Sequence, residues 1–255
     1  RPTAEVDAGA GFVAGLDAGD TGSEIEFGET ATITARATVT ADATARSVSG
    51  DSVSAEAGNT TVNSTASSGA LAPTATMEVY GLHTDNDLTS GAAATIDADA
   101  KASLNASATN VGVVGQASAV SADAELRRAV GLDTDAAGVA LTIGTEATIT
   151  ADSVVSGTAQ STSTEGSANA DAIVTENAGA NTNLINVGGS GSLLAGATST
   201  QTATAQTVTL DGTAQALSLS NIGLDADGAV SFGETGAVQG TATGTNRATA
   251  GSLDE

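Results

Sequence analysis

The feature that most constrains the fold is a short alternating stretch that occurs twice. Residues 29–37 read ETATITARA and residues 146–153 read EATITADS. From Ala147 to Ala151, Ala and Ile fall on one face of an extended chain and both threonines fall on the other, which is the period of a β-strand. Thr and Ile favour strands because their branched Cβ atoms pack well on a pleated surface. The stretch therefore predicts a strand with one buried face.

The two stretches belong to a series of five copies, which we align on the glycine that precedes each of them. The alignment selects Gly28, Gly91, Gly144, Gly196 and Gly233. Three residues before each glycine stands an aliphatic residue: Ile25, Leu88, Leu141, Leu193 and Val230. Five residues after it come Ile33, Ile96, Ile149, Gln201 and Val238, of which only Gln201 is polar. These residues are the predicted core ladder and turn glycines.

A degenerate repeat of about 50 residues, with loop insertions and one short copy, is typical of solenoids, whose units bury their faces against their neighbours. We therefore predict an all-β fold, a β-solenoid, in which Ile33, Ile96 and Ile149 stack in one interior column. A β-sandwich with long strands is the alternative. Aromatic residues make up only 2% of the chain, so the interior must be built from small aliphatic residues, and occasional Ile, Leu or Phe would fill wider corners.

The domain prediction follows the extent of the repeat. Residues 15–255 form a single repetitive β-domain, and residues 1–14 form an N-terminal segment that is able to donate a strand to a neighbouring molecule. The repeat persists to residue 251, and we see no capping helix at either end. Because an open terminal coil exposes unpaired strand edges, we expect head-to-tail association of identical chains or continuation of the stack in a longer chain.

A second repeated motif places acidic residues where a strand ends. Segments 13–20, 129–136 and 221–228 each contain Gly-Leu-Asp and a further Asp, which supply the candidate calcium ligands Asp17, Asp20, Asp133, Asp135, Asp225 and Asp227. Carboxylates at this spacing resemble the beginning of Ca²⁺-binding loops. None completes an EF-hand pattern, and Asp is also common in turns because it bonds its own backbone. A calcium site and a plain turn both remain as interpretations.

The charge balance excludes several classes of partner. The formal net charge is −23, and Lys and Arg together number seven. Such a chain cannot line a groove that neutralises nucleic-acid phosphates, and an anionic membrane is an equally poor partner. No run of 18 apolar residues is present, so we expect no membrane insertion.

Catalytic chemistry lacks its parts in this sequence. There is no Cys, and the single histidine, His83, takes the position that Asp17, Asp133 and Asp225 take in other copies. No Gly-x-Ser-x-Gly motif accompanies it. We interpret His83 as a turn variant and expect no enzyme activity, no catalytic residues and no cofactor other than Ca²⁺.

Paired threonines offer a third interpretation of the surface. Thr32 with Thr34, Thr148 with Thr150, and Thr200 with Thr202 occupy the same two positions of their copies in the alignment. Stacked copies would form an outward threonine ladder similar to the flat faces of ice-binding β-solenoids. The ladder is broken by Asp97 and by Ala237 with Gln239, so exposed strand threonines without a ligand are the simpler interpretation.

Over residues 12–251 the chain resembles the extracellular β-solenoid proteins of bacterial surface filaments, sheaths and adhesins. The resemblance is one of architecture, and it implies a secreted structural protein, outside the cell or on its surface, whose main partner is another copy of itself. Because the chain starts without Met, we expect a mature secreted protein. The alternative functions are an adhesin or passenger segment stiffened by Ca²⁺, with surface polysaccharide as its partner, and an ice-binding protein.

Overall fold

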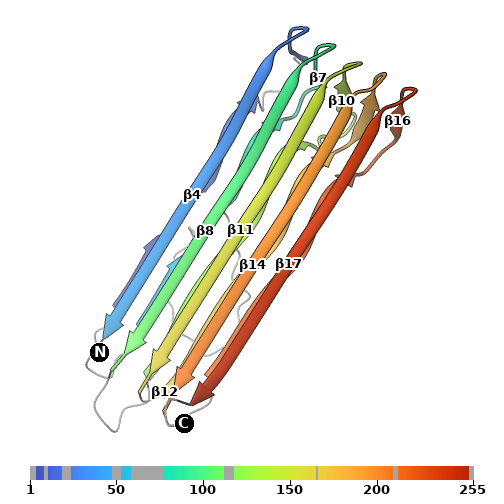
Figure 1. The fold of residues 1–255 in the computed structure, drawn as a ribbon. Coiled ribbons are helices and arrows are strands. Elements are labelled where there is room, and N and C mark those ends of the chain that lie inside the picture. The colour runs from blue at the N-terminus through green and yellow to red at the C-terminus, as the bar shows by residue number, and fades with distance from the viewer. Residues whose placement is uncertain are drawn as a thin grey trace.

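The computed structural model of the 255-residue chain describes residues 4–8, 11–18, 24–47, 53–58, 77–111, 118–164, 166–208 and 212–252. Within these ranges the chain forms strands and no helix. All strand pairs are parallel, and the strands form three sheets that stack coil upon coil (Figure 1). The predicted all-β solenoid is confirmed.

The three sheets differ in strand length. The long sheet has the order β17 (Ala237–Ser252), β14 (Ser192–Thr207), β11 (Thr148–Ser163), β8 (Thr95–Asn110) and β4 (Thr32–Ser47). The short sheet has the order β16 (Val230–Phe232), β13 (Leu184–Val187), β10 (Ala140–Ile143), β7 (Leu88–Thr89) and β3 (Ile25–Glu26). The third, which we call the split sheet, contains β1 (Ala4–Ala8), β2 (Phe12–Ala18), β5 (Val53–Ala57), β6 (Glu78–Thr84), β9 (Ser118–Thr134), β12 (Gly166–Thr182) and β15 (Gly212–Ala226).

Each coil runs through the split sheet, the short sheet and the long sheet in that order. In the first two coils the split sheet takes two strands per coil, so that β5 and β6 both pair with β9. The N-terminal segment is part of the first coil, because β1 pairs with β5 and β2 pairs with β6 of the same chain. Donation of this segment to a neighbouring molecule stays a prediction.

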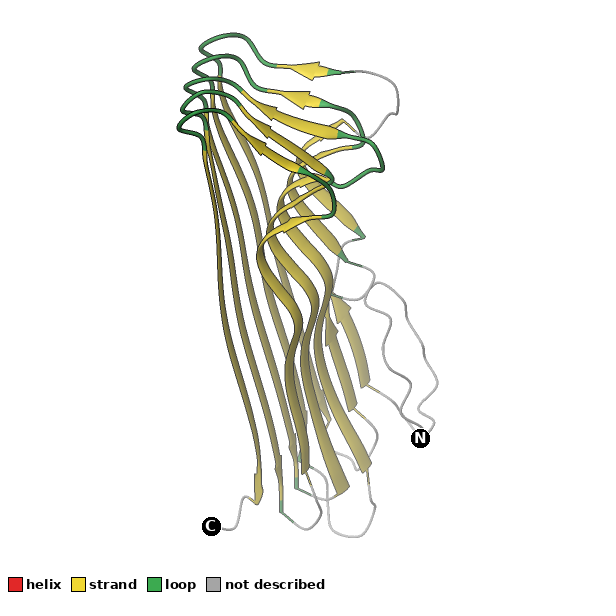
Figure 2. Ribbon diagram, turned by 90° about the vertical axis from the view of Figure 1, so that its right-hand side faces the viewer, coloured by secondary structure: helices red, strands yellow, loops and turns green. Residues whose placement is uncertain are grey.

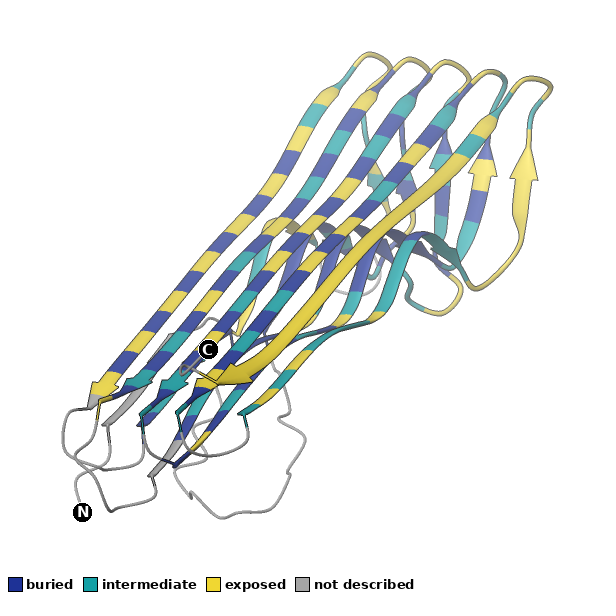
Figure 3. Ribbon diagram, turned by 60° about the horizontal axis from the view of Figure 1, so that its bottom comes forward, coloured by how far each residue is buried: buried dark blue, intermediate teal, exposed yellow. Residues whose placement is uncertain are grey.

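The interior changes character along the strands. Between the long and split sheets the buried residues are mainly Ala, as at alternate positions from Ala37 to Ala45 on β4 and from Ala55 to Ala57 on β5. Where the short sheet closes the coil, larger side chains such as Leu88, Ile96 and Leu141 fill the space between three sheets. Figure 3 shows the alternation of buried and exposed residues along the long strands. Small residues therefore set the narrow part of the core, and branched residues fill its wide corner.

The register of the strands places most of the predicted ladder residues next to one another in neighbouring coils. Ile25, Leu88 and Leu141 pair across neighbouring coils, and so do Ile33, Ile96 and Ile149. Among the ladder residues, five have fully buried side chains: Leu88, Leu141, Ile96, Ile149 and Leu193. Ile25, Ile33 and Val238 are half-buried because they lie in the first and last coils, and Val230 is exposed.

The predicted alignment is wrong in the fourth copy. In the structure Ile149 pairs with Leu193, and Leu141 pairs with Ile185, so Leu193 belongs to the ladder of Ile33 rather than to that of Ile25. Gly196 pairs with Asp152 inside β14 and is not a turn glycine. The turn of this coil is at Gly188, whose amide donates to the carbonyl of Ile143. The short copy disappears, because the third and fourth coils are offset by 44 residues and the fourth and fifth by 45.

The correction also explains Gln201. It pairs with Gly157 on β11 and with Asn246 on β17, and its side chain is fully buried. The Gln201 amide nitrogen donates to Ser199 Oγ at 3.1 Å, while its oxygen occupies the space that a Cβ at Gly157 would need. A small residue in one coil thus accommodates a large one in the next.

A column of glycines marks a bend in the split sheet. Gly15, Gly81, Gly131, Gly179 and Gly223 occupy equivalent positions in the five coils, and a Cβ at any of them would meet the backbone of the long sheet. Figure 2 shows the strands of the split sheet curving along their length as they approach the short sheet. Only glycine permits this approach, because a side chain would collide with main-chain atoms that cannot move aside.

Candidate functional site

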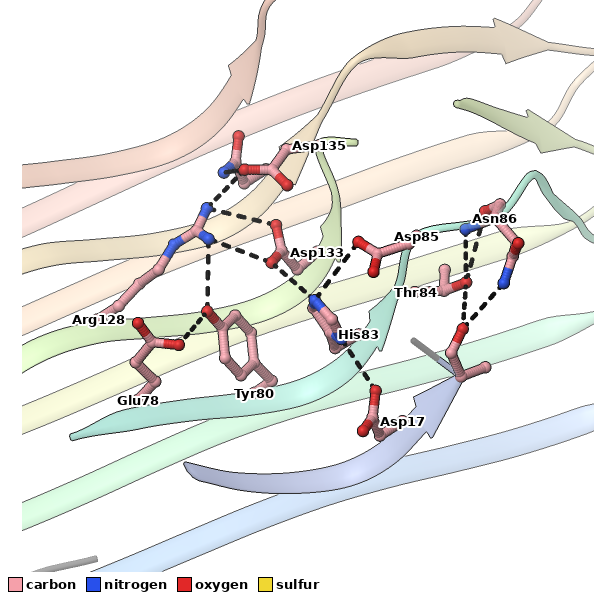
Figure 4. A network of polar contacts seen from close by, with 12 residues as sticks. Asp17, Glu78, Tyr80, His83, Thr84, Asp85, Asn86, Arg128, Asp133 and Asp135 are labelled. Atoms are coloured by element: carbon pink, nitrogen blue, oxygen red, sulfur yellow. Dashed lines mark hydrogen bonds and ion pairs between the residues drawn. The ribbon is translucent and has the colours of Figure 1, made fainter. Parts of the chain in front are cut away.

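A polar network lies on the split sheet where β2, β6, β9 and β12 run side by side (Figure 4). Asp17 on β2, His83 on β6 and Asp133 on β9 are neighbours in register. His83 Nδ1 lies 2.9 Å from Asp17 Oδ1, and His83 Nε2 lies 3.8 Å from Asp133 Oδ2. The position predicted to be a turn variant is therefore an imidazole between two carboxylates of adjacent coils.

Arg128 on β9 forms the second half of the network. Its guanidinium contacts Asp133 Oδ2 at 3.3 Å, Asp135 Oδ2 at 2.9 Å and Glu176 Oε1 of the next coil at 3.0 Å. Its charged end lies 5.6 Å from the centre of the Tyr80 ring, a cation–π contact. One cation thus joins carboxylates from two coils, which ties the coils together at the bend.

Burial changes the acid–base properties of this network. Desolvation raises the pKa of Asp133 to about 7, although Arg128 opposes the shift. Burial would lower the pKa of Arg128, but the charge of Asp133 and its other acidic partners outweighs it and raises that pKa. Burial also raises the pKa of the Tyr80 phenol, which donates to Glu78 Oε2 at 3.0 Å. The network holds Arg128 permanently charged next to an acid that titrates near neutrality.

Three of the predicted calcium ligands, Asp17, Asp133 and Asp135, have protein side chains as their ionic partners. Asp133 and Asp135 bind the guanidinium of Arg128, and Asp17 binds His83. Among the described residues, no group of three or more acidic or His side chains is placed to hold a metal ion. Asp225 and Asp227 lie in the fifth coil, and Asp20 lies outside the described residues. In these contacts the partner of each carboxylate is an Arg or His side chain of the same chain.

A second set of acidic residues lies in the part of the split sheet where β5 pairs with β9. Glu56, Asp123 and Asp171 pair in register on β5, β9 and β12. Burial raises the pKa of Asp123 to about 7 and that of Glu125 to about 8. Glu125 is 1% exposed, and neither of its carboxylate oxygens has a hydrogen-bond partner among the described residues. At pH 7 the carboxyl of Glu125 is therefore mostly protonated and uncharged.

The threonine ladder is interrupted more often than the alignment indicates. The two columns that begin at Thr32 and Thr34 continue on β14 with Ser192 and Leu194. Thr200 and Thr202, which the alignment places in these columns, instead pair with Ser156 and Thr158 on β11, eight residues further along the strands. No continuous pair of threonine columns crosses the long sheet in the described residues.

The first and last coils hold most of the large apolar side chains that are exposed in the described residues. Five of the exposed large hydrophobic residues lie there: Phe12, Leu16, Leu219, Val230 and Phe232. Phe232 is 54% exposed and Leu219 is 65% exposed. Almost every residue of β17 is exposed on both faces, although the equivalent residues of β14 alternate between buried and exposed (Figure 3). On its outer side the fifth coil therefore exposes positions that are buried in the neighbouring coil.

Arg128, Glu125 and the Phe residues at the two ends of the stack have no clear signature in the sequence. Arg128 and Glu125 stand near other charged residues in a plain strand. Arg128 contacts Asp133 and Asp135 of its own coil and Glu176 of the next coil, whereas the carboxylate of Glu125 has no hydrogen-bond partner among the described residues. Phe27 and Phe232 are predicted only as corner fillers, without their place at the two ends of the stack. Knowledge of the correct register would have found all of them, because the register decides which residues become neighbours.

The described residues contain no helix with the length and apolarity to cross a membrane. Comparison with protein-family models, with curated proteins and with solved structures found no match. The coils of this chain are therefore the basis on which its function is inferred.

Proposed function

We propose that the chain is a structural subunit of an extracellular filament or sheath that assembles head to tail through its two end coils. The observation that carries this proposal is the uncovered fifth coil. Its strand β17 is 16 residues long, is exposed along almost its whole length, and from Ala237 to Gly251 presents the outer row of its backbone hydrogen-bonding groups at the edge of the long sheet.

The opposite end of the stack offers a matching edge. The strand β4 is also 16 residues long and is the outermost strand of the long sheet at that end. All strands are parallel, so the first coil of one copy continues the stack beyond the fifth coil of another without reversing direction. A contact between two different surfaces does not close on itself and builds an open filament.

Among the described residues, strand β17 lacks the devices that isolated proteins use against such pairing. Edge strands are usually protected by Pro, by bulges, by inward-pointing charge or by a covering segment. Strand β17 contains no Pro and one charged residue, Arg247, and it pairs with β14 without interruption over its whole length. An unprotected edge of this length is a binding surface for another strand.

Electron microscopy of the purified protein tests the proposal. We expect unbranched filaments whose length increases with protein concentration and time, and whose cross-section matches one coil. Monodisperse rods that never lengthen would overturn the filament proposal. They would favour the alternative function, an adhesin or passenger segment in which a longer chain occupies the same edges.

A further inference from the structure

We propose that residues of the two end coils fix the register of the contact between two copies. The first coil of a second copy docks on the fifth coil of the first copy. Phe232 then lies against Phe27, and Arg247 lies beside Asp42, of that second copy. This inference rests on the proposed function, and it adds which residues select the contact. We obtain this contact by applying the strand register between neighbouring coils of one molecule to the junction between two molecules.

The internal register is strict in the long sheet. All four interfaces between neighbouring long strands pair 16 residues without a bulge or a slip. A fifth interface of the same kind sets Ala237 of β17 beside Thr32 on β4 of the second copy. The apolar ladder then continues, because Val238 meets Ile33 and Val230 meets Ile25 of that copy.

The aromatic residues mark the two ends of one column. In the short sheet Ile143 pairs with Val187, and Val187 pairs with Phe232. In the other direction the column passes through Ser90 to Phe27 in the first coil. Two of the three Phe residues of the chain thus stand at the ends of a column whose middle is not aromatic. Docking covers the exposed Phe232 ring with the half-buried Phe27 ring, and aromatic pairs stabilise contacts beyond their buried area.

Charge at the junction selects the same register. Arg247 is exposed on β17 and makes no ion pair with any described residue. Its column runs through Thr202, Thr158 and Asn105 to Asp42 in the first coil. Asp42 Oδ1 accepts from Asn105 at 2.7 Å, which leaves its outer side available. The register therefore brings a cation to an anion in a chain whose net charge is −23.

The pair discriminates against slipped contacts. A slip of one residue would turn the inward face of β4 outward, which the apolar ladder forbids. A slip of two residues keeps the faces but places Arg247 beside Thr40 or Thr44, and it removes the contact between the two Phe rings. Only the unslipped register satisfies the charge and the aromatic contact together.

The space next to Gly28 gives a further, steric argument for the same contact between copies. A Cβ at Gly91 would meet the carbonyl of Gly28, and a Cβ at Gly144 would meet the carbonyl of Gly91. A Cβ at Gly28 meets no atom within 4 Å, because the described residues place no coil on that side of Gly28. In the docked pair the turn at Gly233 of the other copy takes that place, so Gly28 is needed for docking and not for folding.

Disulfide trapping tests the register directly, because the chain has no cysteine. The double substitution Thr40→Cys with Thr245→Cys places one thiol at each end of a single column. Parallel neighbours lie about 4.8 Å apart, within the range a disulfide spans. We expect a ladder of covalent multimers after mild oxidation. The matched control is Thr44→Cys with Thr245→Cys, whose thiols would be about 13 Å out of register.

Three outcomes are informative. Multimers from the Thr40 variant alone support the inference. Equal trapping by both variants, or trapping by the Thr44 variant alone, overturns the register while the filament proposal survives. If the wild-type protein does not elongate and neither variant is trapped, the filament proposal fails and the register inference fails with it.

Charge reversal provides an independent test. Arg247→Asp and Asp42→Arg should each slow elongation about tenfold, and the double variant should recover most of the wild-type rate. The control is Lys101→Asp on β8, an exposed cation away from both ends whose substitution changes the net charge as much as Arg247→Asp does. Filaments of both single variants that grow at the wild-type rate would refute the pairing.

Discussion

At the scale of single residues, Glu125 is a buried acid whose carboxylate has no hydrogen-bond partner among the described residues. It lies where β9 passes from its partner β5 to its partner β6, and the amides of both Arg127 and Arg128 reach back to the carbonyl of Met77 at this point. The side chain is buried with both oxygens unpartnered among the described residues. A buried carboxylate without a partner is strongly disfavoured, so the group remains protonated until its pKa of about 8 is passed.

Glu125 predicts that the protein is more stable in weak acid than in weak base. The pKa is about 8 in the folded protein, against an ordinary value of 4.5, so between these values the folded state binds more protons than the unfolded state. The free energy of unfolding therefore falls as the pH rises through this window, and Asp123 and Asp133 act in the same direction up to about pH 7. Thermal unfolding should show a higher melting temperature at pH 5 than at pH 8.

The substitution Glu125→Gln isolates the contribution of this residue. The variant should be more stable than the wild type at pH 8, by about 2 kcal/mol, and should show a flatter pH dependence, because its side chain cannot ionise. Glu146→Gln is the control, since Glu146 is exposed in a turn and the change of charge is the same. An unchanged pH profile for Glu125→Gln would show that the carboxyl is not the source of the effect.

At the scale of elements, the bend in the split sheet depends on one glycine per coil. Gly131 approaches the backbone of Gly179 in the next coil and of Asp152 in the long sheet. The bend brings the end of the split sheet toward the short sheet, and the network around Arg128 lies on the same segment (Figures 2 and 4). The glycine column and the ionic network therefore support the same local geometry from two sides.

The substitution Gly131→Ala should destabilise the protein by about 3 kcal/mol, because the added methyl group meets main-chain atoms on two strands. The measurement is the midpoint of urea unfolding. Gly251→Ala on β17 is the matched control, since a Cβ there has no atom nearby. Equal midpoints for the two variants would mean that the sheets separate easily at the bend.

At the scale of the whole molecule, charge opposes assembly and apolar edges favour it. Each copy carries a formal charge of −23. The column that contains His83 continues through Asn181 to Asp225, so docking sets Asp225 next to Asp17 of the second copy. Within the first three coils the imidazole of His83 separates the carboxylates of this column, whereas nothing from the same column separates them at the junction.

Filament growth should therefore accelerate with ionic strength. Raising NaCl from about 10 mM to about 500 mM shortens the screening length from roughly 30 Å to less than about 10 Å, and we expect elongation to increase at least about tenfold. Light scattering follows the rate. Growth that slows with added salt would contradict a junction limited by repulsion. At matched ionic strength, a far larger effect of CaCl₂ than of NaCl would indicate specific binding at Asp17 and Asp225.

Much of the architecture was predictable from local pattern. The alternation of Ala, Ile and Thr around Ile149 determined a strand with one buried face, and its recurrence around Ile33 and Ile96 determined the stacking of coils. These inferences hold because strand periodicity and burial are properties of a few consecutive residues. The low aromatic content likewise implied the narrow Ala-lined interior that the long and split sheets enclose.

The tertiary structure alone decided the register and everything that depends on it. Leu193 and Ile185 are both aliphatic and stand a few residues before a glycine, so the sequence could not say which of them continues the ladder of Leu141; the length of the turn at Gly188 does. The contact of Arg128 with Glu176 joins two neighbouring coils, and the burial of Glu125 depends on how the coils pack around β9. Spacing along the chain carries no information about such contacts when loops of different length separate the strands, because only backbone pairing between coils determines which residues face each other.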